Sequence, residues 1–141
     1  MFAKSLCLAI VLAACGSNGR QIVDPAPIVG ERSVTIAAGK LVELNLDVPV
    51  STLVAAVPID PIEVAFEASD VLAWNIHVHP ESGAPEVVQE GMHAVGVILH
   101  TPGRPGPISL LWENRGAAPI TVTLRVLSLP AGTTGEWYPA P

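Results

Sequence analysis

The chain has few charged residues, and basic ones are the scarcest. Seven Lys and Arg stand against 13 Asp and Glu, which gives a formal net charge of −6, and only 14% of the residues are charged. The basic residues form no cluster of the kind that neutralises phosphates, so nucleic acid is not expected as a partner. Since half of the residues are hydrophobic, the composition also excludes a disordered chain and predicts a packed core.

Cysteine is nearly absent, and the usual catalytic motifs are missing. The only two cysteines, Cys7 and Cys15, lie within the first 15 residues, so the rest of the chain forms no disulfide. No Gly-x-Ser-x-Gly nucleophile elbow and no glycine-rich phosphate loop occurs. Glu63 and Glu67 would lie about 13 Å apart along a strand, too far for a glycosidase pair, and a solvated face accounts for them. The sequence therefore does not predict an enzyme.

The first residues have the pattern of an export signal. Lys4 supplies a positive charge, Ser5 to Ala14 is an almost unbroken apolar run, and small residues precede Cys15. The run is too short for a transmembrane helix, which needs roughly 20 residues. We therefore expect a signal peptide over residues 1–14.

The sequence Leu12-Ala13-Ala14-Cys15 resembles the lipobox of bacterial lipoproteins. The resemblance implies that Cys15 is lipidated and holds the protein on the bilayer of the cell envelope, where a second envelope protein could be a partner. Gly16 follows the cysteine in place of aspartate, which by the same resemblance favours the outer over the inner membrane. The alternative is an ordinary secreted protein with one odd cysteine.

Beyond a Gly/Pro-rich linker over residues 15–31, the pattern is that of strands. Alternating apolar and polar residues, broken by Gly and Pro, predict an all-β domain over residues 32–129. No segment has a helical period. We expect a single antiparallel β-sandwich of seven to eight strands, of the jelly-roll or a related type. Its predicted strands are Ser33–Ala38, Leu41–Val48, Ile62–Glu67, Leu72–His79, His93–Thr101, Ile108–Glu113 and Ile120–Leu127, with a long loop over Pro80–Gly91.

The run Gly106–Gly116, followed by Val122–Val126, resembles the closing hairpin of GOLD-like (emp24-type) β-sandwiches. Such hairpins have a glycine, an apolar strand with an aromatic residue, an Asn at the turn, here Asn114, and a Val/Thr strand. The resemblance covers about half of the chain from Cys15 onward, and it implies a binding or adaptor module with no catalysis.

Two histidines are the best candidates for chemistry. His77 and His79 stand two residues apart on a predicted strand, so their side chains leave the same face about 6 to 7 Å apart. If that strand pairs with His93–Thr101, His93 could join them, with Glu86 or Glu90 from the loop, in a copper or zinc site. The alternative is the polar outer face of an amphipathic strand. If Val95, Val97 and Leu99 are the buried set, His93 shares their side.

The aromatic residues are few, and two of them lie outside any predicted strand. Trp74 and Trp112 fit the inward phase of their strands, which predicts core packing. Trp137 and Tyr138 lie in the Gly/Pro-rich tail of residues 130–141. We expect them to fold back over a sheet edge, where they would block pairing with other chains. The alternative is that they bind a partner.

Overall fold

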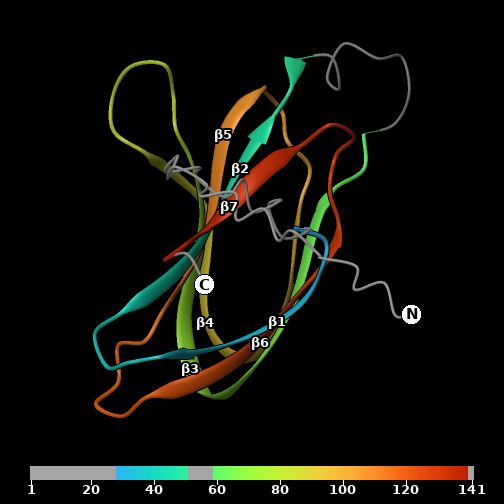
Figure 1. The fold of residues 1–141 in the computed structure, drawn as a ribbon. Helices are drawn as coiled ribbons and strands as arrows, with labels where there is room; N and C mark the ends of the chain where they lie inside the picture. Colours follow the sequence, from blue (N-terminus) through green and yellow to red (C-terminus); the bar gives the residue numbers. More distant parts are fainter. Residues whose placement is uncertain (1–27, 51–58, 140–141) are drawn as a thin grey trace, which may run out of the picture.

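The computed structural model describes residues 28–50 and 59–139. These residues form seven strands, all paired antiparallel, which confirms the predicted all-β class (Figure 1). The strands are β1 (Gly30–Ile36), β2 (Leu41–Val48), β3 (Ile62–Val78), β4 (Glu86–His100), β5 (Gly106–Glu113), β6 (Ile120–Ser128) and β7 (Thr134–Tyr138). Cys15 and the predicted signal segment lie outside the described residues. In the part that is described, no helix is long and apolar enough to span a membrane.

The strands form one strongly curled sheet, a half-barrel, in place of two clearly separate sheets. The order is β1-β6-β3-β5-β2-β7, and β4 pairs with the other edge of β3. β3 joins the two halves, because Glu63–Ala68 pairs with β6 while Ala73–Val78 pairs with β5. The register between β3 and β4 shifts between Glu67 and Leu72, and both strands bend there, as Figure 1 shows at the bottom of the molecule.

Three predicted boundaries and connections were wrong. The predicted strands Ile62–Glu67 and Leu72–His79 are one strand, because pairing continues through the bulge between them. The loop expected over Pro80–Gly91 ends early, since β4 already begins at Glu86. The hairpin implied by the GOLD-like resemblance does not form, because β3 lies between β5 and β6 in the sheet.

The core is formed by the inward residues of this curled sheet. On β2, the alternation of apolar and polar residues places Val42, Leu44, Leu46 and Val48 inside, each 2% exposed or less. Trp112 is fully buried, and its ring lies 6.4 Å from Phe66 and 6.3 Å from Trp137 between centroids. Trp74 packs against this cluster but is only partly buried.

The tail folds back as a strand. β7 pairs with β2, with Leu44 opposite Trp137, so the segment expected to lack a strand extends the sheet. Trp137 packs against the core and lies under the Arg32 guanidinium, 5.2 Å from the ring centroid. Tyr138 is 61% exposed. The fold-back prediction therefore describes Trp137, while Tyr138 faces solvent.

Candidate functional site

Six polar residues meet on the outer face of β2, β5 and β3, around His77. Register places His77 beside Ser109 and Ser109 beside Asn45. The rings of His77 and His79 lie 5.0 Å apart between centroids, as strand alternation predicted. We call this group the His77 cluster; its members are Glu43, Asn45, Asn75, His77, His79 and Ser109.

Both ring nitrogens of His77 face oxygen atoms. Nδ1 lies 2.9 Å from Asn75 Oδ1, and Nε2 lies 3.3 Å from Glu43 Oε1. The side chains of His77 and Glu43 are 13% and 19% exposed, so the pair is largely shielded from solvent. A metal ion would need a ring nitrogen whose lone pair is free, and both nitrogens of His77 are already engaged.

His79 and Ser109 do not form a nucleophile and base pair. Ser109 Oγ donates its proton to Asn45 Oδ1 at 2.6 Å, and Ser109 is only 2% exposed. His79 Nε2, 3.3 Å from the same Oγ, is therefore the donor in that contact. Because the hydroxyl proton points away from the imidazole, His79 is not placed to remove it.

The structure does not bring His93 to the other two histidines. The connection between β3 and β4 is short, so pairing starts at Val78 and Glu86, and His93 comes opposite Leu72, not near His79. His93 Nδ1 accepts a hydrogen bond from Trp74 Nε1 at 3.1 Å, on the side of β3 opposite to Asn75 and His77.

The acidic residues proposed as further ligands do not complete a site. Glu86 pairs with Arg104 at 3.4 Å, and Glu90 lies opposite Asn75 in the register. Within residues 28–50 and 59–139, no group of three His, Cys, Asp or Glu side chains could hold a metal ion. The geometry therefore gives copper or zinc binding no support.

Two histidines should make the stability of the fold depend on pH. Burial lowers the pKa of His77, against an opposite effect of the Glu43 carboxylate, and burial also lowers the pKa of His100. The unfolded chain then binds more protons than the folded one below the usual histidine pKa of about 6.5. We expect the melting temperature to be lower at pH 5.0 than at pH 7.5. Combining His77→Gln with His100→Gln should reduce this difference, and an unchanged difference would contradict the assignment.

A surface that the sequence analysis missed lies on β4. In the described part of the chain, six of the eleven exposed large hydrophobic side chains belong to this strand. Three of them, Val95, Val97 and Leu99, alternate on its outer face and are 65%, 62% and 56% exposed, while Ile98 between them is buried. We call these three the β4 patch. The sequence analysis considered these three residues as a buried set, whereas in the structure they face solvent.

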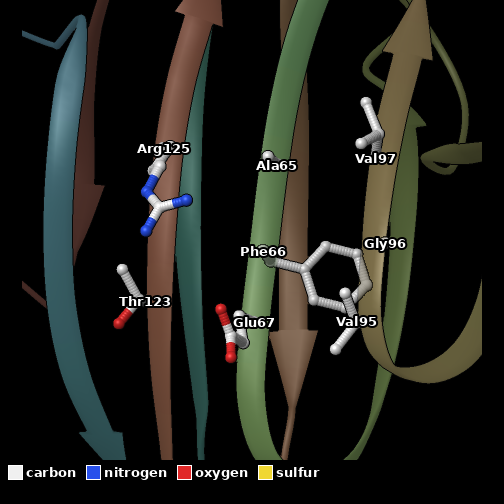
Figure 2. A pocket seen from close by; sticks show the side chains of 8 residues that line it. All are labelled: Ala65, Phe66, Glu67, Val95, Gly96, Val97, Thr123 and Arg125. Atoms are coloured by element: carbon white, nitrogen blue, oxygen red, sulfur yellow. The ribbon is translucent and has the colours of Figure 1, made fainter.

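A shallow hollow of about 210 Å³ borders the β4 patch (Figure 2). Val95 and Val97 line it from β4, Ala65 and Glu67 from β3, and Thr123 and Arg125 from β6. Figure 2 shows the Phe66 ring reaching from β3 toward Gly96 of β4. A Cβ on Gly96 would lie 2.8 Å from that ring, which is why the strand carries glycine there.

A wider hollow, of about 690 Å³, lies where β2, β3 and β5 approach their connecting segments. Its charged lining residues include Arg104, which pairs with Glu86, and its only histidine is His79, which bonds Ser109. Arg104 and His79 therefore already have partners within the protein, while the other charged lining residues, Asp47 and Glu81, are both acidic.

Comparison with known proteins identified no relative of this chain. No protein-family model matches the chain, and no curated protein matches its sequence. The lipobox-like segment and the GOLD-like resemblance therefore remain predictions from the sequence. A function for this protein therefore has to be inferred from the His77 cluster, the β4 patch and the two hollows.

Proposed function

We propose that this protein is a lipoprotein of a bacterial cell envelope, anchored through Cys15, whose β-domain is a non-catalytic binding module. The observation that carries the binding role is the β4 patch, because aliphatic side chains gathered on an exposed strand are typical of interaction surfaces. The motif Leu12-Ala13-Ala14-Cys15 supports the anchor, and Gly16 supports the outer membrane.

The absence of catalysis is supported by the His77 cluster. Its best nucleophile, Ser109, is buried and donates its proton to Asn45. We further propose that the curled sheet is a variant of the GOLD-like or jelly-roll sandwich, in which the bent β3 and β4 connect the two layers. The strand pattern and the bulge between Glu67 and Leu72 support this interpretation.

Replacing Cys15 with serine should abolish lipid attachment. We expect the full chain, expressed in a bacterial host fed with labelled palmitate, to incorporate label and to sediment with the membranes. Because several acyl chains on one cysteine hold a protein firmly, Cys15→Ser should reduce the label to background and release the protein from the lipid phase.

The matched control is Cys7→Ser, which removes the other cysteine but leaves the lipobox-like motif intact. This variant should retain the label and the membrane fraction of the unmodified chain. Label that persists in Cys15→Ser, or an unmodified chain that incorporates none, would refute the anchor.

A further inference from the structure

A third hollow, of about 380 Å³, lies where β3 and β4 pair beside the β5–β6 connection. Its lining combines residues of β3, the β4 residues opposite them in the register and one arginine of the connection: Ala73, Trp74, Asn75, Glu90, Gly91, Met92 and Arg115. The small side chain of Ala73, between Glu113 of β5 and Met92 of β4, leaves this part of the sheet unfilled. Sites for small ligands usually measure about 300 to 1,000 Å³, so the hollow has room for one small molecule.

Three polar groups of this lining have hydrogen-bonding capacity left over. Asn75 uses its Oδ1 toward His77, at 2.9 Å, which leaves its Nδ2 to donate. Arg115 gives only Nε to Glu113, at 2.6 Å, so its two terminal nitrogens remain. The carboxylate of Glu90 forms no ion pair within residues 28–50 and 59–139. Donors and an acceptor with free capacity therefore converge on one hollow.

The remaining lining is carbon surface. Trp74 Nε1 already donates to His93 Nδ1 at 3.1 Å, so the indole offers the hollow its carbon atoms. A Cβ on Gly91 would lie 2.8 Å from Trp74 Cζ2, which means that the glycine makes room for this ring. The side chain of Met92 is 57% exposed beside it. A ligand of the hollow would thus meet polar groups and apolar surface together.

We propose that this hollow binds one residue of a sugar through two neighbouring hydroxyl groups. A hydroxyl both donates and accepts, so it can donate to the Glu90 carboxylate and accept from Arg115 or Asn75. Hydrogen bonds to charged groups are the stronger ones, and planar carboxylate and guanidinium groups can engage two adjacent atoms at once. The C–H face of the sugar ring would lie on Met92 and Trp74.

The charges of the hollow favour this neutral ligand over an ion. An anion accepts hydrogen bonds but cannot donate them, and it would meet the carboxylates of Glu90 and Glu113. An ammonium group donates but cannot accept, and it would face the N–H groups of Arg115 and Asn75. Because Arg115 is already paired with Glu113, the lining has no uncompensated positive charge to hold a phosphate or carboxylate.

The sugar site deepens the binding role proposed above by naming a ligand class, and it rests on that role. It does not use the β4 patch, and it does not depend on Cys15. The two proposals can therefore be tested on the same chain by different measurements.

The test is saturation-transfer difference NMR on the full chain, held in a polyoxyethylene detergent that carries no sugar. The probes are the methyl glycosides of glucose, galactose, mannose and N-acetylglucosamine. We expect at least one of them to give a saturable signal with a dissociation constant on the order of 1 mM, as suits a ligand of this size in a shallow site. Acetate, tetramethylammonium and glycine, as an anion, a cation and a zwitterion, should give none.

Two variants place the signal in the hollow. Glu90→Ala removes the acceptor from an exposed position and should weaken binding about tenfold. Arg115→Lys keeps the charge beside Glu113 but loses the planar fork, and it should also weaken binding. The matched control is Glu136→Ala, which removes an exposed carboxylate from β7, opposite Asn45, and should bind like the unmodified chain.

The proposal would be overturned if none of the four glycosides bound, or if acetate, tetramethylammonium or glycine bound equally well. Equal binding by Glu90→Ala and Glu136→Ala would place the sugar elsewhere and overturn it too. Its failure is distinct from failure of the anchor, because Cys15→Ser should lose the palmitate label and still bind the sugar. A labelled chain without sugar binding would refute the hollow alone and leave the β4 patch as the binding surface.

Discussion

Replacing Asn114 with alanine should lower the free energy of unfolding by about 3 kcal/mol. Asn114 is fully buried, and its Nδ2 donates to Ile36 O at 2.9 Å and to Ala118 O at 2.8 Å. Its Oδ1 accepts from Gly116 N at 2.9 Å. Alanine would leave these three main-chain groups without their partner, and each buried group left unpaired costs about 1 to 3 kcal/mol.

Asn75→Ala is the matched control, since the Asn75 side chain makes one bond, to His77, on the half-buried outer face. It should cost less than about 1 kcal/mol. Thermal unfolding followed by circular dichroism should show a fall in melting temperature on the order of 10 °C for Asn114→Ala. If the two variants unfolded at the same temperature, the side chain of Asn114 would not hold the connections together as described.

Asn114 also shows which structural features could be predicted from the sequence and which could not. The sequence placed it correctly at the turn after an apolar strand, and the resemblance expected an asparagine there. The structure adds that the turn does not close a hairpin. Asn114 instead ties the β5–β6 connection to the end of β1, and its main chain bonds Gly39 and Lys40 of the β1–β2 turn. Such contacts between distant segments leave no periodic pattern in the sequence.

The strands were predictable wherever one face is buried in the core and the other is exposed to solvent. β2 and β6 alternate in this way, and both were predicted as strands close to their observed bounds. β4 is different, because Val95, Val97 and Leu99 resemble a buried set, while Gly96 gives no sign that the Phe66 ring fills the space beneath it. The β4 patch could be found only as an uncharged run, Ala94–Leu99, which a core strand shows equally well.

The candidate site was predicted in part. His77 and His79 share a face because alternation along a strand is local, and this much follows from their spacing. The position of His93 depends on the residue at which β4 begins. Because β4 begins at Glu86, His93 lies opposite Leu72 and not near His79. The partners of the two histidines, Glu43 and Ser109, come from strands far away in sequence, and neither was considered as a neighbour.

Replacing Gly135 with alanine should detach β7 from the sheet. A Cβ at Gly135 would lie 2.5 Å from Asn45 O and 2.8 Å from Leu46 Cδ2. β2 pairs with β5 along eight residues and with β7 along only five, so β7 is the strand that we expect to move. Overpacking of this kind costs about 1 to 3 kcal/mol or more, and the movement would also separate Trp137 from Trp112.

Gly103→Ala is the control for this last prediction, because a Cβ there would meet no atom within 4 Å. It should unfold like the unmodified chain. Gly135→Ala should show faster hydrogen exchange of the β7 amides and a red-shifted tryptophan emission as Trp137 becomes exposed to water, with smaller changes in β1 and β6. Normal protection of β7 in Gly135→Ala would mean that β2 can adjust. Freed of β7, the edge of β2 would be open, so this variant should also be more prone to aggregate.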